Sequence, residues 1–206
     1  KAYAVLDPKR KDCRYPFKEL SGCGVGFKLC QGLNTIYKIP ETELYDLTDL
    51  LAISIAADIV AMTGENRVLA KLGLKTLRKT RKIGLRLLIP EEKISTFDIS
   101  NIVFEIAPKI NAAGRISHGK ASVELMISEN LKQAHQIADN ILDLNDSRRE
   151  LDANITQSAI NQVLETKQEN NSTTVVYHHE WNKGVIGIVA SRLTEIYYKP
   201  TLVFTD

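Results

Sequence analysis

Four positions in this sequence have residue types and neighbours suited to metal or phosphate chemistry. Asp58 is a carboxylate, the hard oxygen ligand that Mg²⁺ and Mn²⁺ favour in proteins. Arg115 follows the small residues 111–114, which leave room for a phosphate, and a guanidinium group matches phosphate oxygens bidentately. Asn182 and Gly184 open an expected helix, whose free N–H groups can bind an anion.

Asp58 lies in residues 55–61, which are otherwise apolar. Desolvation heavily penalises an isolated carboxylate in such surroundings, so we expect a buried Asp58 that has a partner. A lysine or arginine, a helix N-terminus and a divalent cation all fit that role. The residues alone leave a structural salt bridge and a metal site open.

The other candidates also have simpler interpretations. Arg115 could be a surface arginine after a tight turn, and many helices that follow a β-strand begin with glycine, as at Gly184. The basic run from Arg67 to Arg86 lies in a stretch, residues 66–90, that contains no acidic residue. This run is either a solvated helix face or a patch that attracts phosphate groups.

Composition restricts the class of protein. Hydrophobic residues make up 44% of the 206 residues and charged residues 25%, which is typical of a globular protein and excludes general disorder. The net charge is +2, so attraction to nucleic acid has to come from local patches. Three cysteines without zinc-ribbon spacing predict free thiols and a cytoplasmic location. The longest apolar stretch, residues 50–62, is too short for a membrane span, so no membrane partner is expected.

Helices are the elements expected to position most of these residues. A glycine-rich helix is predicted near residues 20–33, buried so that another backbone or a ligand compensates for its glycines. A central helix near 42–62 and a basic helix near 65–80 follow. A short strand is predicted at 102–106, before a glycine-containing turn that ends at Arg115.

Between Gly119 and Gly184 the sequence has neither glycine nor proline, and apolar residues recur at helical spacing. We expect one very long helix here, or two nearly collinear helices broken near residues 145–147, acting as a strut between two domains. The C-terminal residues predict a strand at 173–177, a helix at 184–198 and a strand at 201–205. Such a βαβ unit is too small to fold alone, so we expect a fragment truncated at both ends.

Five segments in order resemble the RecJ family of single-strand exonucleases, within the DHH phosphoesterase superfamily. These segments are residues 15–28, 57–60, 64–67, 108–115 and 181–193. The resemblance implies an α/β fold in three parts. Residues 1–118 would be the C-terminal part of a DHH-type catalytic domain, residues 119–171 a long connecting helix, and residues 172–206 the beginning of a DHHA1-type α/β domain.

The resemblance implies a 5′-to-3′ exonuclease that acts on single-stranded DNA with two divalent ions, Mn²⁺ or Mg²⁺. Asp58 matches the aspartate of the family's Ala-Asp motif, which implies a catalytic metal ligand. Asn111 and Arg115 match its substrate-phosphate motif. Asn182 stands where the family often has histidine, and since an amide cannot act as a general acid, binding is the role expected of Asn182 and Gly184.

The family's Asp-His-His motif falls before Lys1, so these residues alone are expected to be inactive. One alternative is another DHH phosphoesterase acting on short oligonucleotides or cyclic dinucleotides. A second is a non-catalytic nucleic-acid-binding module. Besides single-stranded DNA, the partners that the resemblance suggests are single-strand-binding protein and a RecQ-type helicase.

Overall fold

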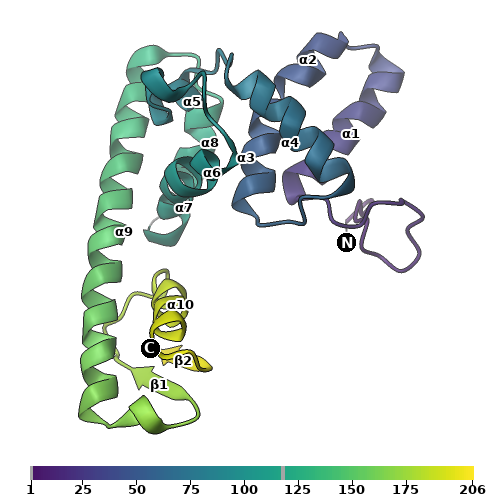
Figure 1. Cartoon of the computed structure of the whole chain (residues 1–206). Helices are drawn as coiled ribbons and strands as arrows, with labels where there is room; N and C mark the ends of the chain where they lie inside the picture. Colours follow the sequence, from purple (N-terminus) through teal and green to yellow (C-terminus); the bar gives the residue numbers. More distant parts are fainter. Residues whose placement is uncertain (1, 117–118) are drawn as a thin grey trace. The chain divides into compact units, whose positions relative to one another are not determined.

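The computed structural model describes residues 2–116 and 119–206, which form helices and a small parallel sheet (Figure 1). The chain divides into two compact units, Lys1–Pro108 with Leu125–His135, and Lys109–Glu124 with Gln136–Asp206. Among the described helices, none has the length and apolarity needed to cross a membrane.

The α-helices are α1 (Gly22–Tyr37), α2 (Glu41–Asp46), α3 (Thr48–Ala57), α4 (Gly64–Leu77), α5 (Ile83–Leu88), α6 (Ile99–Asn101), α7 (Ala107–Ile116), α8 (Lys120–Met126), α9 (Leu131–Glu165) and α10 (Ile186–Tyr197). Shorter elements are the 3-10 helices η1 (Glu91–Lys93) and η3 (Gln168–Asn170), the π-helical segment η2 (Ile102–Ile106), and the strands β1 (Thr174–Tyr177) and β2 (Thr201–Phe204).

Helix α3 is the centre of the first unit, as predicted for this region. Leu51 and Ile55 are fully buried and pack with residues of α1 and α4. Helix α4 crosses α3 closely, because a Cβ atom at Gly73 would lie 2.1 Å from the backbone oxygen of Thr48. The predicted single helix is broken at Leu47, between α2 and α3, and it ends at Ala57.

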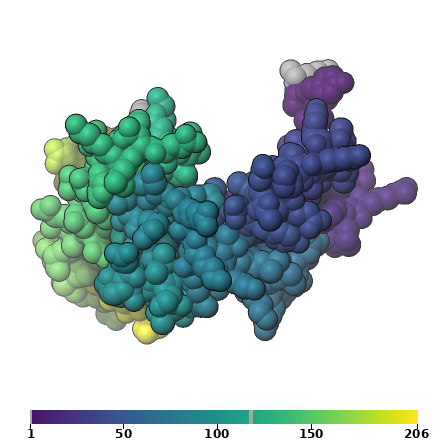
Figure 2. All heavy atoms as spheres, turned by 90° about the horizontal axis from the view of Figure 1, so that it is seen from above, coloured from purple at the N-terminus to yellow at the C-terminus, as the bar shows by residue number. Residues whose placement is uncertain are grey.

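Helix α1 begins where its sequence predicts, but it is only partly buried. The hydroxyl group of Ser21 caps it by accepting a hydrogen bond from the Gly24 N–H at 3.1 Å. A Cβ atom at Gly22 or Gly26 would meet nothing within 4 Å in the described structure. Of the two compensations expected for these glycines, the close approach of another backbone is therefore absent at Gly22 and Gly26 within residues 2–116 and 119–206. In the space-filling view, the purple residues before α1 project from the rest of the first unit (Figure 2).

The strand predicted at residues 102–106 is wrong, because these residues form the π-helical segment η2, continuous with α6 and α7. The Ala107 N–H bonds to the Ile102 oxygen, five residues back. Pro108 supplies no N–H and its ring would clash with the oxygen of Phe104 in a regular α-helix, so a wider turn is favoured here. Residues 111–114 are likewise helical, rather than a turn.

The long helix is confirmed, but its predicted break near residues 145–147 is wrong. Helix α9 runs unbroken for 35 residues, about 52 Å. The interruption lies earlier, between α8 and α9, where the side chain of Asn130 accepts a hydrogen bond from the Gln133 N–H at 3.0 Å. Such a contact is a typical helix N-cap.

The C-terminal βαβ unit is confirmed, since β1 and β2 pair in parallel with Thr174 opposite Thr201. Helix α9 supplies the apolar surface that this small unit lacks on its own. Ile155, Ala159 and Val163 of α9 form one core cluster with residues of β1 and α10 and with Trp181. The α/β fold class is therefore correct, and the three cysteines are free thiols.

Candidate metal ligand and phosphate-binding residues

Asp58 lies at the C-terminal end of α3, and its side chain is exposed. Its N–H donates to the Ser54 oxygen at 2.9 Å, and its carboxylate accepts from the Ser54 hydroxyl at 3.1 Å. The expectation of a buried carboxylate is therefore wrong. The helix ends at Ala57, and Ile59 has a left-handed backbone with φ of 51°, which turns the chain out of the core.

The segment after Asp58 is fixed by residues of the predicted 64–67 motif. Asn66 is fully buried, and its amide donates to the backbone oxygens of Glu19 at 2.6 Å and Ala61 at 3.0 Å. Gly64 has φ of 49°, and a Cβ atom there would lie 2.7 Å from the Phe17 ring. These two motif residues therefore have a structural role, which is to set the path of the chain between Asp58 and α4.

Hydroxyl groups connect Asp58 to the start of α1. The hydroxyls of Ser21 and Ser54 lie 3.0 Å apart, and Ser54 also contacts the Asp58 carboxylate. Cys23 is exposed at the surface, but partial desolvation by its neighbours raises the pKa of its thiol, and the charges of Asp58 and Cys30 add to that effect. Cys23 therefore stays protonated at neutral pH and offers Asp58 no thiolate as a competing charge.

Within residues 2–116 and 119–206, no three His, Cys, Asp or Glu side chains group in a way that could hold a metal ion. Asp58 can contribute one carboxylate oxygen pair to such a site. Its exposure means that a cation could reach it without disturbing the core.

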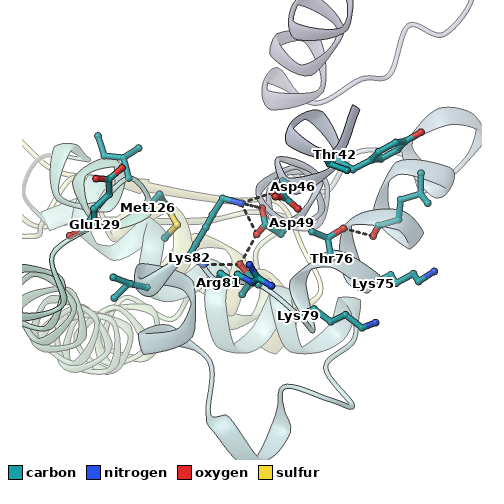
Figure 3. A pocket seen from close by; sticks show the side chains of 16 residues that line it. Thr42, Asp46, Asp49, Lys75, Thr76, Lys79, Arg81, Lys82, Met126 and Glu129 are labelled. Atoms are coloured by element: carbon teal, nitrogen blue, oxygen red, sulfur yellow. Dashed lines mark hydrogen bonds and ion pairs between the residues drawn. The ribbon is translucent and has the colours of Figure 1, made fainter. Parts of the chain in front are cut away.

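The buried carboxylate of the first unit is Asp49, which sequence reasoning missed. Asp49 is 0% exposed, and both its oxygens lie 2.9 Å from the Lys82 ammonium group. Thr80 also donates to it at 2.7 Å. Figure 3 shows these contacts as dashed lines. A buried charge does need a partner, but the residue concerned is Asp49, whose apolar neighbours Leu50 and Leu51 were the available signal.

In the second unit, three of the predicted phosphate-binding residues come together. Arg115 Nη1 donates to the Gly184 oxygen at 3.1 Å, and a Cβ atom at Gly184 would lie 2.1 Å from the Arg115 oxygen. Asn182 Oδ1 accepts from the Gly184 N–H at 2.8 Å. Asn111 is exposed one helical turn before Arg115 on α7, so both project from the same face.

Further arginines make this region electropositive. Burial lowers the pKa of Arg148, and the positive charges of Arg149, Arg115 and Arg192 lower it further, although Asp152 opposes this. Arg148 Nη2 donates to Asn145 Oδ1 at 3.1 Å. Positive charges that disfavour the charged form of Arg148 also attract an anion. Sequence reasoning missed Arg148, because nothing along the chain indicates that α9 passes near Arg115.

No family model matches the chain. It is 40% identical over 205 residues to the single-stranded-DNA-specific exonuclease RecJ of Bacillus subtilis (strain 168), a match that covers 97% of this chain and 25% of that protein. The RecJ protein of Escherichia coli (strain K12) is 30% identical over 220 residues, covering 98% of this chain and 38% of that one.

Solved structures of RecJ proteins are similar to the chain as well. RecJ of Thermus thermophilus in complex with Mg²⁺ superposes with a TM-score of 0.80 at 27% identity, covering 93% of this chain and 30% of that chain. A structure of exonuclease RecJ bound to manganese matches with a TM-score of 0.80 at 29% identity, covering 93% of this chain and 48% of that one.

The helical unit, the long helix and the parallel βαβ unit form an α/β fold that matches part of the solved RecJ structures. The chain belongs to the RecJ family. It spans 25% to 38% of the length of the curated relatives that it matches.

Proposed function

We propose that the protein containing this chain is a 5′-to-3′ exonuclease that hydrolyses phosphodiester bonds of single-stranded DNA in recombination and repair. The observation that supports this is the agreement of nearly the whole chain with RecJ proteins in both sequence and fold. The division into residues 1–118, 119–171 and 172–206, as the end of a DHH-type domain, a connecting helix and the beginning of a DHHA1-type domain, is part of the same proposal.

Asp58 is the residue proposed to bind a divalent ion. Its carboxylate is exposed at the end of a buried helix, so the core holds it in place while solvent reaches it. The solved relatives carry Mg²⁺ or Mn²⁺, and either ion would activate water and stabilise the leaving oxygen. Because one carboxylate cannot hold two ions, residues 1–206 alone are expected to be inactive.

Asn111, Arg115, Asn182 and Gly184 are proposed to hold the DNA backbone. Arg115 uses one guanidinium nitrogen on the Gly184 oxygen, which orients the group and leaves its other N–H donors for phosphate oxygens. Asn182 uses its oxygen on the Gly184 N–H, so its NH₂ group is the part that would donate to a phosphate. Asn182 binds rather than transfers a proton in this proposal.

The test is degradation of a long single strand, labelled at its 5′ or 3′ end, by the full-length protein with Mn²⁺. The 5′ label should be released first, and Asp58→Ala should slow release by about 100-fold or more, since one metal ligand is lost. Asp139→Ala, which removes another exposed carboxylate, is the matched control and should cleave normally. Faster hydrolysis of dinucleotides than of long strands would instead indicate a phosphoesterase for short substrates. Binding of the strand without any metal-dependent cleavage would indicate a non-catalytic module.

A further inference from the structure

The first unit contains a hollow that is not explained by Asp58. It has a volume of about 1130 Å³ and is lined by α2, by the C-terminal end of α4, by the following residues 79–83 and by residues 126–129 (Figure 3). We call it the basic groove, after Lys75, Lys79 and Arg81, three cations that line it. It shares no residue with the Arg115 cluster.

The packing of α4 explains why its cations face outward. Arg67, Lys71 and Lys75 follow one another at four-residue steps on α4 and form a stripe about 12 Å long, and Lys79 follows just after the helix ends at Leu77. Gly73 lies on the opposite face of the helix, where it is packed against α3. The stripe therefore faces away from α3, and Lys75 and the following Lys79 both line the basic groove.

The buried Asp49 explains the direction of Arg81. Thr80 and Lys82 both turn inward to contact the Asp49 carboxylate, at 2.7 Å and 2.9 Å. Arg81, which lies between these two residues, is exposed instead of buried. It lines the groove together with Lys75 and Lys79.

The three cations are not neutralised within the described part of the chain. No carboxylate of residues 2–116 or 119–206 forms a salt bridge with Lys75, Lys79 or Arg81. Asp49 is occupied by Lys82. Glu129 also lines the groove, but Figure 3 shows it on the opposite side, beyond Met126. The groove is therefore lined by four cations, Lys75, Lys79, Arg81 and Lys82, and by three carboxylates, Asp46, Asp49 and Glu129, which leaves a net positive charge.

An aromatic ring accompanies the cations. Tyr45 lines the groove and is 52% exposed, which is high for a tyrosine next to a helical core. Proteins that bind single strands combine a positive groove for the backbone with aromatic rings on which bases stack. We propose that the basic groove binds the phosphate groups of a single-stranded nucleotide chain and that Tyr45 stacks on one base. The choice of a single strand rests on the proposed function, whereas the site itself does not require catalysis.

The first experiment measures binding of a fluorescent 20-nucleotide thymidine strand to the full-length protein in EDTA, where cleavage is absent. A variant with Lys75→Gln, Lys79→Gln and Arg81→Gln should bind about tenfold more weakly, and the slope of log K against log salt should fall by about 2. The control variant changes three exposed cations of the same unit, Lys11→Gln, Arg14→Gln and Lys38→Gln, and so has the same net charge. An equal loss in both variants, or no loss in either, would overturn the proposal.

The second experiment tests Tyr45. Tyr45→Ala should weaken binding of the thymidine strand by about fivefold to 100-fold, and Tyr45→Phe should restore it, because stacking requires the ring and not the hydroxyl. An abasic strand of the same length should bind equally to the wild type and to Tyr45→Ala. If Tyr45→Ala weakens both strands alike, the stacking role is wrong.

Competition experiments distinguish binding of a nucleotide chain from binding of a free nucleotide. If micromolar thymidine monophosphate or inorganic phosphate displaces the strand, the proposal is overturned, because a single phosphate group would then be enough to fill the site. If the groove variant binds single strands with the affinity of the wild type and degrades them at the same rate, the groove proposal alone is overturned. If the full-length protein binds the strand through the groove but never cleaves it when metal is added, the proposed function alone is overturned.

Discussion

Gly184 shows how a single missing methyl group shapes the candidate phosphate site. Its Cα lies so close to α7 that an added Cβ would meet the Arg115 oxygen at 2.1 Å, a distance that real Cβ contacts do not reach. The same glycine accepts from the Arg115 guanidinium and donates to Asn182. Its small size thus sets the relative positions of the three residues.

We therefore expect Gly184→Ala to lower the free energy of unfolding by about 1–3 kcal/mol, since backbone must shift to accommodate the methyl group. Gly187→Ala is the matched control. That glycine lies in α10 with nothing within 4 Å of its Cβ position, so alanine should be neutral or stabilising by about 0.5–1 kcal/mol. Urea unfolding of both variants distinguishes the two cases, and equal stability of the variants would contradict the contact.

Glu65 is a second residue whose contacts allow a prediction, here about the pH dependence of stability. It accepts from the Tyr15 hydroxyl at 2.6 Å and pairs with Lys28 at 2.6 Å. Burial would raise its pKa, but the bonds to Lys28 and Tyr15 outweigh that effect and lower the pKa. Its contribution to stability is therefore complete above the unfolded pKa, about 4.3, and is lost as the pH falls through the lower folded pKa.

Glu65→Gln should cost about 1–2 kcal/mol at pH 7, because a charged hydrogen-bond partner is lost. The difference in unfolding free energy between the variant and wild type should shrink as the pH falls below about 4.5. Unfolding by urea between about pH 3 and pH 7 measures both effects. A difference that stayed constant with pH would show that the Glu65 charge does not stabilise the fold.

At the scale of elements, buried ion pairs connect helices to their neighbours. Asp49 and Lys82 join α3 to the segment after α4, and Asp152 and Arg192 join α9 to α10 with contacts of 2.9 Å and 2.6 Å. In both pairs the carboxylate is almost fully buried and the cation is more exposed. Removing the cation should therefore be more harmful than removing both partners, since it leaves a buried charge without compensation.

For the first pair, Lys82→Met should lower the free energy of unfolding by about 3–5 kcal/mol. Adding Asp49→Leu to that variant should recover most of the loss, because no buried charge remains. Thermal or urea unfolding of the single and double variants measures the difference. A double variant no more stable than Lys82→Met would show that the contact acts through packing and not through charge.

At the scale of the whole molecule, the candidate residues are divided between the two units. Asp58 and the basic groove belong to the first, whereas Arg115, Asn182 and Gly184 belong to the second. Helix α9 contributes residues to both units, and its C-terminal half completes the core of the βαβ unit. Within each unit, candidate residues that lie far apart in the sequence come together.

Much of this could be predicted from the sequence. The long helix, the parallel βαβ unit and the RecJ resemblance depend on local composition and on ordered motifs, and all three are confirmed. The grouping of Arg115 with Gly184 was not predicted as a contact, although both were candidates. The π-helical segment was mistaken for a strand, because β-branched residues favour strands whereas Pro108 and the following helix decide the outcome here.

Residue types and short-range spacing were enough to indicate the RecJ resemblance and the approximate elements, because motifs and hydrophobic periodicity are local properties of the sequence. The tertiary structure decided which carboxylate is buried. Asp49 and Asp58 both have apolar neighbours, but α3 ends between Ala57 and Ile59, so Asp58 reaches solvent while Asp49 meets Lys82. Burial is a property of where a helix ends and what packs against it, and the residues that settle this for Asp49 lie more than thirty positions further along the chain.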